Sequence, residues 1–443
     1  MRGIEGALCV LQEVEKGAFA SEALRKVWGE ITPNERKLAA TLSYLTLRRF
    51  GLWKHILGKY CKRSPEALHP RTVSFLLPGI AGVLELRHFK PGVLVNALVS
   101  YARRLETEID GYRDAALINA VLHTVMEKAP AYIESLRKAP ALRDQALGEG
   151  VPGWAAAEWN KDWGMKDAKR LLQLSAAQTC LSVRMSPGED ARRWAEAYGE
   201  HGEHPAQPSD AMPGAVRIDG NPYPPDLPGY AEGRVTPQSE ASMWAVETLL
   251  GHWQGDTLLD MCMGRGVKAA HILSYRPDVR TEGWELSSAR LGAAEREFRR
   301  LGVEERAIRF CGDATAMVPA CVPSAILLDA PCSGSGTWGR HPEGKWRTNP
   351  QKLSRMADLQ RRLFARAADI LAPGGVMLYC TCSIFREENE KVVGAVMAAR
   401  ADLVEIPLRR GSMPQVRGKP YGSYVLPENP WTDGFFLALL KKK

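Results

Sequence analysis

The stretch Ala325-Ile-Leu-Leu-Asp-Ala-Pro-Cys-Ser-Gly-Ser-Gly336 joins a short apolar run to a turn rich in proline, serine and glycine. An apolar run of this length, bounded by turn residues, is typical of a buried β-strand. The turn that begins at Pro331 keeps the chain close to the carboxyl end of that strand. Ligands bind at the carboxyl ends of parallel strands, so Asp329 and Cys332 are candidates for a functional site.

Four further apolar runs alternate with helical patterns in this half of the chain. They are Thr257-Leu-Leu-Asp-Met261, Thr281-Glu-Gly-Trp-Glu285, Ile308-Arg-Phe-Cys311 and Val376-Met-Leu-Tyr-Cys380. Between residues 353 and 371 apolar side chains recur at helical spacing, until Pro373-Gly374-Gly375 stops the helix. Strands that alternate with helices predict a doubly wound α/β domain with a parallel sheet.

The composition of the whole chain is that of an ordinary globular protein. At about 150 residues per domain, 443 residues predict roughly three domains. Hydrophobic residues make up 45% and charged residues 25%, which excludes a disordered or fibrous chain. The net charge of +8 and a pI near 9.0 favour a polyanionic partner such as nucleic acid.

The first part of the chain, residues 1–127, has apolar residues at helical spacing and predicts a helical domain. It holds 18 Lys+Arg against 13 Asp+Glu, so 18 − 13 = +5 of the net charge lies there. This basic surface either contacts nucleic acid or is only a solvated helix face, and charge alone does not decide between them.

Residues 128–232 are rich in proline, glycine and tryptophan, with seven prolines between residues 203 and 230. This composition is typical of a connector around a small mixed domain.

Neither a membrane span nor a metal site is indicated by the sequence. The longest apolar stretch is shorter than the roughly 20 residues that a membrane helix needs, and the N-terminus lacks the apolar core of a secretory signal. We therefore expect a cytoplasmic protein. The nine cysteines include no Cys-x-x-Cys pair, which argues against a disulfide framework and against structural zinc.

A glycine-bearing turn follows the first strand, in Asp260-Met-Cys-Met-Gly-Arg-Gly-Val-Lys268. Glycines there allow a ligand to approach the backbone closely at the start of a helix. The pattern Gly264-x-Gly266-x-x-Ala269, with Glu285 nineteen residues beyond Gly266, also fits the loose dinucleotide fingerprint. A nicotinamide-dependent enzyme therefore stays open as an alternative.

Three acids end successive strands: Glu285, Asp313 and Asp329. Together they indicate an adenosine-shaped pocket, although an acid after a strand often only caps the next helix. Ser287 and Ser288 can cap the helix after Glu285 by themselves, which leaves Glu285 available to a ligand.

Two cysteines are expected to reach one crevice. Cys332 lies in the turn after one strand, and Tyr379-Cys-Thr-Cys-Ser383 ends another. Side-chain alternation puts Cys380 and Cys382 on one face, with Cys382 nearer the carboxyl end. A single free cysteine is usually a core residue, but two at neighbouring strand ends indicate chemistry.

Several motifs of this region are shared with a known enzyme family. They are Asp329-Ala-Pro-Cys-Ser-Gly, Arg340-His-Pro-Glu-Gly-Lys-Trp, Leu371-Ala-Pro-Gly-Gly, Thr381-Cys-Ser-Ile followed by Glu387-Glu-Asn-Glu, Gly233-Arg-Val-Thr-Pro-Gln and Asp433-Gly-Phe-Phe. In these motifs the chain resembles RNA cytosine-5 methyltransferases of the Sun/RsmB type. Residues 1–127 are similar, more loosely, to the NusB-like domain that precedes the catalytic core of such enzymes, mainly in Leu117-Ile-Asn-Ala-Val-Leu122.

The resemblance implies a multidomain fold and a methyl donor. An all-α NusB-like, RNA-binding domain is expected over residues 1–127, a small α+β connector domain over 128–232, and a Rossmann-like class I methyltransferase domain over 233–443. The implied cofactor is S-adenosylmethionine, and its implied binding residues are Cys262, Met263, Gly264, Arg265, Gly266, Val267, Lys268, Glu285, Asp313 and Asp329.

The cofactor loop departs from the family pattern, most notably at Arg265 and Val267. Relatives usually have Cys-Ala-x-Pro-Gly-Gly-Lys, whereas this chain has Arg265 in place of the proline and Val267 in place of a glycine. A β-branched residue resists positive φ, so Val267 is the departure that bears on the shape of the turn.

The chemistry uses two thiols because C5 of cytosine becomes nucleophilic only after covalent addition at C6. The motifs alone permit either cysteine to attack, since DNA cytosine-5 enzymes use a Pro-Cys thiol like Cys332. The family resemblance implies that Cys382 attacks and that Cys332 helps to remove the C5 proton. Asp329 is expected to hydrogen-bond the cytosine edge.

The segment between Gly339 and Arg347 is expected to form an exposed loop that contacts RNA, because it combines cations with an aromatic residue. The expected RNA-binding residues are Arg340, His341, Lys345, Trp346 and Arg347. For Trp346, core packing is the alternative.

These observations lead to one expected activity and two alternatives. The expected activity is methylation of C5 of a cytosine in small-subunit (16S) ribosomal RNA, with no metal. The alternatives are a non-catalytic RNA-binding protein with a degenerate cofactor loop and an NAD-dependent oxidoreductase, which would leave Cys332 and Cys382 without a use.

Overall fold

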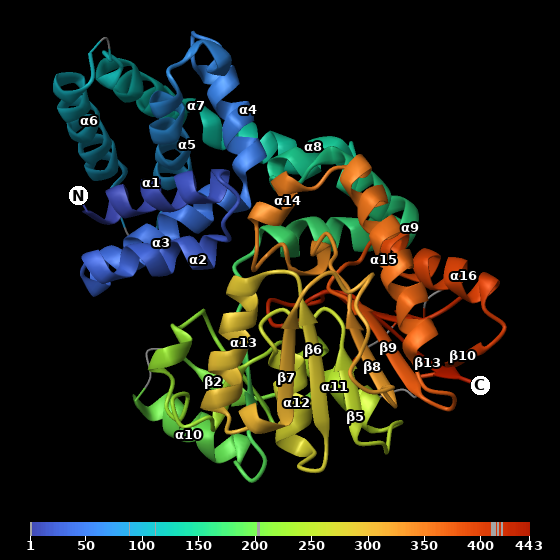
Figure 1. Ribbon diagram of the computed structural model, residues 1–443. Coiled ribbons are helices and arrows are strands. Elements are labelled where there is room, and N and C mark those ends of the chain that lie inside the picture. The colour runs from blue at the N-terminus through green and yellow to red at the C-terminus, as the bar shows by residue number, and fades with distance from the viewer. Residues whose placement is uncertain are drawn as a thin grey trace. The chain divides into compact units, whose positions relative to one another are not determined.

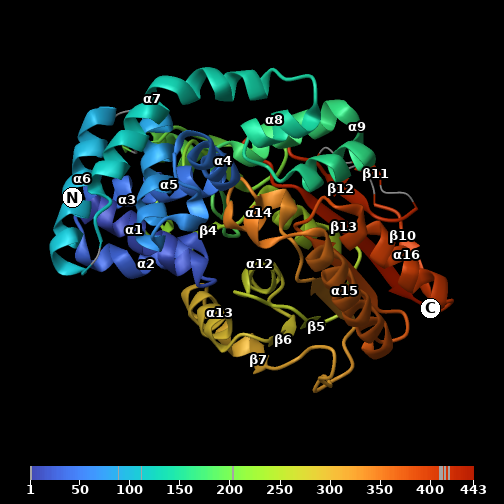
Figure 2. The same ribbon diagram turned by 90° about the horizontal axis from the view of Figure 1, so that it is seen from above.

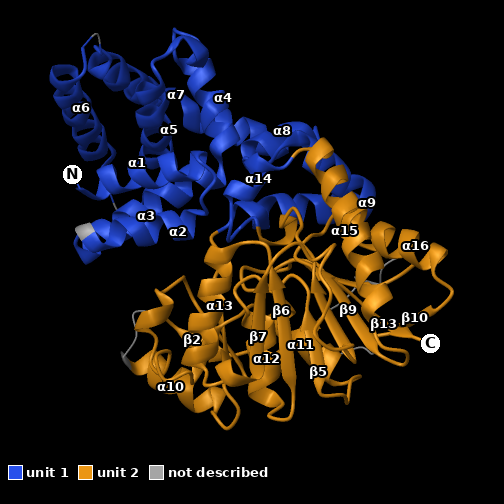
Figure 3. Ribbon diagram, viewed as in Figure 1, with its two compact units in different colours: residues 1–177, 338–348 blue, residues 178–337, 349–443 orange. Residues whose placement is uncertain are grey.

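The structure is a computed structural model that describes residues 2–87, 89–110, 112–201, 204–408, 413, 416–417 and 420–443. The chain forms two compact units (Figure 3): unit 1 comprises residues 1–177 and 338–348, and unit 2 comprises residues 178–337 and 349–443. The sequence predicted a boundary between residues 127 and 128, but that point lies inside the helix Ala115–Arg137. Residues 128–177 therefore continue unit 1.

Unit 1 is built from helices, as predicted for its first 127 residues (Figure 1). Its α-helices are α1 (Arg2–Glu15), α2 (Ala20–Val27), α3 (Pro33–Arg48), α4 (Phe50–Tyr60), α5 (Pro70–Glu85), α6 (Pro91–Glu108), α7 (Ala115–Arg137), α8 (Leu142–Gly148), α9 (Gly153–Ala176) and α14 (Glu343–Arg347). A capping box starts α3, where the Thr32 amide donates to Glu35 Oε2 over 3.0 Å. Leu76, Ile80 and Leu98 are fully buried in the shared core.

Unit 2 begins with a small antiparallel sheet in the order β2-β3-β1-β4, accompanied by the helix α10. The elements are β1 (Leu181–Met185), α10 (Ala191–His201), β2 (Ala206–Pro208), β3 (Ala215–Ile218) and β4 (Val235–Pro237). Val183, Val216 and Val235 have no exposed surface and form its core. The sequence predicted a small mixed domain over residues 128–232; this sheet belongs to unit 2, and its strand β4 lies beyond residue 232.

The larger sheet has nine strands, with the path β11-β12-β13-β9-β8-β5-β6-β7 and β10 paired to β13. The strands are β5 (Thr257–Asp260), β6 (Arg280–Glu285), β7 (Ala307–Cys311), β8 (Ala325–Asp329), β9 (Val376–Thr381), β10 (Leu403–Ile406), β11 (Val416–Arg417), β12 (Ser423–Val425) and β13 (Phe435–Lys442). The five predicted strands, β5 to β9, pair in parallel. The antiparallel strand β13, which extends the sheet beyond β9, was not predicted.

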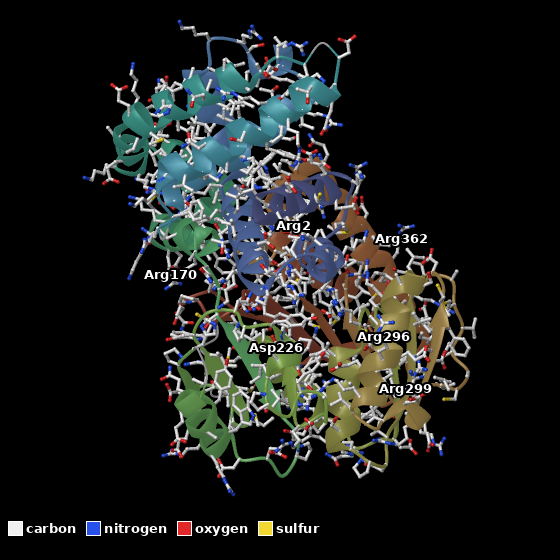
Figure 4. All side chains as sticks on the ribbon, turned by 90° about the vertical axis from the view of Figure 1, so that its left-hand side faces the viewer. Arg2, Arg170, Asp226, Arg296, Arg299 and Arg362 are labelled. Carbon is white, nitrogen blue, oxygen red and sulfur yellow. The ribbon has the colours of Figure 1, made fainter. Side chains whose placement is uncertain are left out.

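Helices cover both faces of this sheet (Figure 2). They are α11 (Glu240–Leu250), α12 (Val267–Tyr275) and α13 (Ser288–Arg300) on one face, and α15 (Pro350–Ile370) and α16 (Glu390–Ala399) on the other. Alternation along β9 shows the two faces: Leu378 joins the core beneath α11, whereas Tyr379 stacks on Phe364 of α15. On the outer side of α13, Arg296 and Arg299 are exposed (Figure 4).

Among the residues that the structure describes, no helix is long and apolar enough to cross a membrane. All nine cysteines are free thiols.

Candidate active site

The candidate site lies along the carboxyl edge of the parallel strands in unit 2. Asp260 ends β5, Glu285 ends β6 and Asp329 ends β8. Because these strands run in parallel, their carboxyl ends meet at one edge of the sheet. The turns after β8 and β9 bring Cys332 and Cys382 to the same edge.

The two cysteines lie together, with 3.5 Å between their sulfur atoms. Backbone hydrogen bonds hold the two turns side by side: the Ala330 amide donates to the Cys380 carbonyl over 3.0 Å, and the Gly336 amide donates to the Cys382 carbonyl over 2.9 Å. Both cysteines are partly exposed as residues. The structure thus joins two residues fifty positions apart into one pair.

The environment of Cys332 changes its acidity. The hydrogen bond between the thiols, together with burial, raises the pKa of Cys332 well above its ordinary value. Cys332 therefore keeps its proton at neutral pH. Cys380 belongs to the core instead: it is fully buried, and burial raises its pKa well above the ordinary value.

A buried lysine and two carboxylates lie next to this pair. Lys268 Nζ donates to Asp329 Oδ2 over 2.5 Å. Burial opposes the charged form of Lys268, but the Asp329 carboxylate outweighs burial and raises the lysine's pKa. Asp260 is 2% exposed, and its Oδ1 atom has no hydrogen-bond partner among the described residues. Burial, followed by the charge of Asp329, raises the pKa of Asp260 to about 8.

The turn between β5 and α12 can accommodate the β-branched side chain of Val267. Gly264 and Gly266 have positive φ, 58° and 75°, whereas Val267 is the first residue of α12. No non-glycine residue in the described part of the chain has positive φ. The left-handed positions of the turn therefore fall on glycines, and a β-branched residue at position 267 is compatible with it.

Glu285 holds this loop against the end of β6. Its carboxylate is 6% exposed and accepts from the Gly264 amide and from the Ser287 amide, each over 2.9 Å. Ser287 also caps α13, as predicted, by accepting from the Arg290 amide. A β-carbon added at Gly264 would meet nothing within 4 Å, so the loop backbone beside Glu285 is open to a ligand.

Asp313, the third predicted acid, is exposed after β7. Its Oδ1 atom accepts from the amide and the hydroxyl of Thr315, over 2.9 and 2.8 Å, and the backbone hydrogen bond lowers its pKa. This is a local turn contact and not a helix cap, because no helix follows Asp313 in the described stretch before β8.

The prediction that residues 340–347 form an exposed loop is wrong. The segment contains the short helix α14 and belongs to unit 1. Lys345 is fully buried, and its ammonium group donates to the carbonyls of Arg48 and Ser175 over 2.7 and 2.9 Å. Trp346 Nε1 donates to the Leu47 carbonyl over 2.7 Å.

Arg347 makes the same kind of contact, because its guanidinium donates to the carbonyls of Val14 and Ala18 over 2.5 and 2.6 Å. The last carbonyls of a helix have no partner within the helix, and these side chains satisfy such carbonyls at the ends of α1, α3 and α9. Lys345, Trp346 and Arg347 are therefore engaged inside unit 1. Arg340 and His341 are partly exposed, and RNA contact by them stays a prediction.

The motif Glu387-Glu-Asn-Glu390 had no role predicted from the sequence. In the structure Glu388 is fully buried beside the cysteines, and its carboxylate accepts from the amide and hydroxyl of Ser333. Three acids and an amide after a strand are more polar residues than a helix cap needs, so the sequence did mark this segment. The partner of Glu388 could not be predicted, because Ser333 is fifty-five positions away in the chain.

Two family descriptions match the chain. Residues 247–441 match the family described as 16S rRNA methyltransferase RsmB/F, and residues 5–127 match the NusB family. Among curated proteins, a Thermus thermophilus protein named ribosomal RNA small subunit methyltransferase B is 31% identical, over 98% of this chain and 96% of its own. A Vibrio cholerae protein of the same name is 28% identical, over 99% and 96%.

Solved structures share the fold. The crystal structure described as that of PH0851 has a TM-score of 0.83 at 22% identity, over 100% of this chain and 98% of its own. A methyltransferase homolog from Pyrococcus horikoshii has a TM-score of 0.58 at 23% identity, over 69% and 100%. NSun6 from the same organism, solved with the S-adenosylmethionine analogue SFG, has a TM-score of 0.56 at 17% identity, over 65% and 97%.

Proposed function

The chain belongs to the RsmB/F family of 16S rRNA methyltransferases, and from that premise we propose that it methylates C5 of a cytosine in 16S ribosomal RNA through a covalent cysteine adduct. Its methyl donor is S-adenosylmethionine. The observation that carries the cytosine-5 assignment is the pair of free thiols, Cys332 and Cys382, whose sulfur atoms lie 3.5 Å apart. A methyltransferase acting on a nucleophilic nitrogen or oxygen would have no use for that pair.

The reaction proceeds by addition, methylation and elimination. The Cys382 thiolate forms a bond to C6, and the electrons of the C5–C6 double bond make C5 nucleophilic. S-adenosylmethionine, when held by residues 262–268 and Glu285, would supply an electrophilic methyl group to C5 and leave as its demethylated thioether. The Cys332 sulfur then takes the C5 proton, the C5–C6 double bond reforms, and the bond between Cys382 and C6 breaks.

The acidity of Cys332 supports this division of roles. The hydrogen bond to Cys382 and burial raise the pKa of Cys332, so this thiol keeps its proton before addition and is not the nucleophile. Once Cys382 is bonded to C6, it no longer offers the hydrogen bond or the negative charge that raise the pKa of Cys332. Loss of these two causes lowers that pKa, so after addition Cys332 gives up its own proton to solvent, and the resulting thiolate is the base that takes the C5 proton.

The shape of the turn after β5 supports the proposed cofactor-binding residues. The open backbone at Gly264 and the buried carboxylate of Glu285 form a cradle at the end of β6 that suits a nucleoside with ribose hydroxyls. We assign cofactor binding to residues 262–268, Glu285 and Asp313. Lys268 orients Asp329, and we assign Asp329 to the cytosine edge.

The parts of the chain take separate tasks in this proposal. The catalytic residues lie in unit 2, within residues 233–337 and 349–443, which hold the large sheet. The NusB-like residues 1–127, with their net charge of +5, bind RNA. The target cytosine must be unstacked or single-stranded to reach the thiols, at a cost of a few kcal/mol.

Transfer of labelled methyl groups from S-adenosylmethionine to small-subunit ribosomal RNA tests the proposal, with nucleoside analysis for 5-methylcytosine and denaturing gels for protein–RNA adducts. Wild type should produce 5-methylcytosine. Cys382→Ala should form no adduct, and Cys332→Ala should accumulate one. Cys321→Ala, which removes an exposed cysteine elsewhere in unit 2, should behave as wild type.

Two results would contradict the proposal. Loss of the adduct only in Cys332→Ala would exchange the roles of the two cysteines. If wild type transfers no methyl group to any RNA, the function is refuted in favour of an RNA-binding protein without catalysis.

A further inference from the structure

Each cysteine of the pair is followed by a serine, and the serines are paired as the cysteines are. The hydroxyl oxygens of Ser333 and Ser383 lie 3.2 Å apart, close to the 3.5 Å between the sulfur atoms of Cys332 and Cys382. Two Cys-Ser dipeptides from different turns thus lie side by side. Contacts that hold the two serines in place therefore also hold the backbone segments that carry the two thiols.

Glu388 holds the first dipeptide. It lies in a 3₁₀ turn after β9, is fully buried, and uses both carboxylate oxygens on one residue. Oε1 accepts from the Ser333 amide over 2.7 Å, and Oε2 accepts from the Ser333 hydroxyl over 2.5 Å. Gln360 of α15 also donates to Oε1, over 3.3 Å, and to the Pro331 carbonyl over 2.8 Å. The turn that carries Cys332 is therefore held from both sides of the thiol.

Asn389, the next residue, holds the second dipeptide. Its Nδ2 atom donates to the Ser383 carbonyl over 2.9 Å, and its Oδ1 atom accepts from the Thr381 hydroxyl over 2.5 Å. Asn389 is fully buried. Adjacent residues of one short segment thus hold the two turns that carry the two thiols.

Burying a charged carboxylate costs free energy unless hydrogen bonds or a charged partner compensate it. Burial raises the pKa of Glu388, because it disfavours the charged carboxylate. The donors that contact this carboxylate are the amide and hydroxyl of Ser333, the hydroxyl of Ser383 and the side-chain amide of Gln360. An apolar side chain would fill the same space without the cost. What it could not do is accept two hydrogen bonds from the residue after Cys332.

We propose that Glu388 is a positioning residue that keeps Cys332 at working distance from the adduct on Cys382, and so sets the rate of elimination. The proposal rests on the proposed function, in which Cys332 removes the C5 proton. Without the carboxylate, the turn after β8 loses both of its contacts at Ser333. The turn after β9 loses one contact, at the Ser383 hydroxyl, and keeps its two hydrogen bonds to Asn389. Addition should therefore continue while release of the product slows.

The experiment compares Glu388→Ala, Glu388→Gln and Glu387→Ala in the full chain, with S-adenosylmethionine and small-subunit ribosomal RNA. Glu387 is the matched control, because its carboxylate only pairs with Lys391 at the surface. The measurements are kcat, KM for S-adenosylmethionine, and the fraction of enzyme covalently bound to RNA at steady state.

Glu388→Ala should lower kcat about tenfold or more, leave KM within about twofold, and raise the adduct fraction, because a base displaced by about 1 Å transfers protons poorly. Glu388→Gln should recover kcat to within about threefold, since its amide can accept from the Ser333 amide and donate to the Ser333 hydroxyl. Glu387→Ala should match wild type.

The inference is overturned if kcat and the adduct fraction fall together in Glu388→Ala, or if Glu388→Gln is as slow as Glu388→Ala. If Glu388→Ala fails to fold, Ser333→Ala removes only the hydroxyl and should raise the adduct fraction by itself; an unchanged fraction overturns the inference. Failure of the proposed function looks different, because wild type would then form neither methylated RNA nor adduct.

Discussion

The indole of Trp346 packs directly on Gly51 of α4, where a β-carbon would lie 2.7 Å from a ring carbon. Trp346 comes from the part of the sequence that carries the cysteines, yet its helix α14 is built into unit 1. The absence of a side chain at position 51 is what makes room for the ring. The core of unit 1 is therefore complete only with a segment from the later sequence.

Substitution at this contact should destabilise unit 1. Gly51→Ala forces the ring of Trp346 to move and should lower the free energy of unfolding by about 1–3 kcal/mol. Gly58→Ala, in the same helix, is the matched control, because its β-carbon would lie 3.8 Å from Pro65. Alanine there should be neutral or stabilise by up to about 1 kcal/mol, since glycine is a poor helix former. Thermal unfolding checks both, and equal effects would argue against the contact.

Substitution should have a large effect at position 266 of the cofactor loop and a small effect at position 267. In Gly266→Ala the residue has a φ of 75° and a β-carbon 2.8 Å from the ring of Phe298, so stability should fall by about 1–3 kcal/mol and S-adenosylmethionine should bind more weakly. Val267→Gly restores the family residue but should change the Kd less than about threefold, or about 0.6 kcal/mol, because residue 267 is helical. Calorimetric titration measures both. A large gain in affinity for Val267→Gly would contradict the structure of the turn.

Asp260 should make stability depend on pH. Its pKa is raised from the ordinary 3.8 to about 8, so the folded chain keeps a proton that the unfolded chain loses. Stability from this group is therefore complete below about pH 4 and decreases as the pH rises to about 8. The advantage of Asp260→Asn over wild type should grow between pH 5 and pH 7.5 by at least about 1 kcal/mol.

Melting temperatures across this pH range test the effect of Asp260. Asp256→Asn, at an exposed position near the start of the same strand, is the control and should run parallel to wild type. A constant difference between Asp260→Asn and wild type would show that Asp260 is ionised in the folded protein.

The acidity of Cys332 should depend on its partner. In Cys382→Ala the hydrogen bond and the charge that raise the pKa of Cys332 are both removed, so this pKa should fall. The alkylation of Cys332 by iodoacetamide, followed by peptide mass spectrometry, should then reach its plateau at a lower pH than in wild type. Cys321→Ala should leave the profile unchanged. An unshifted profile in Cys382→Ala would mean that the two thiols are not coupled.

The sequence predicted the parallel strands β5 to β9 and the helix before β9 correctly, because short apolar runs and helical spacing are local signals. It also placed Cys332 and Cys382 at one edge, since the carboxyl ends of parallel strands coincide. It was wrong about residues 340–347. Two glycines and several cations look like an exposed loop when nothing in the local sequence shows that the ends of other helices will surround them.

The sequence by itself determined the order of helical and α/β parts, and it singled out the glycines of the turn after β5 and the two cysteines to which we assign the chemistry. Only the tertiary structure decided which of these residues meet. The burial of Lys345 against helix ends and the contact of Glu388 with Ser333 depend on backbone groups far away in the chain. Such contacts form because buried donors and acceptors must find partners in space, and a local pattern of side chains does not identify those partners.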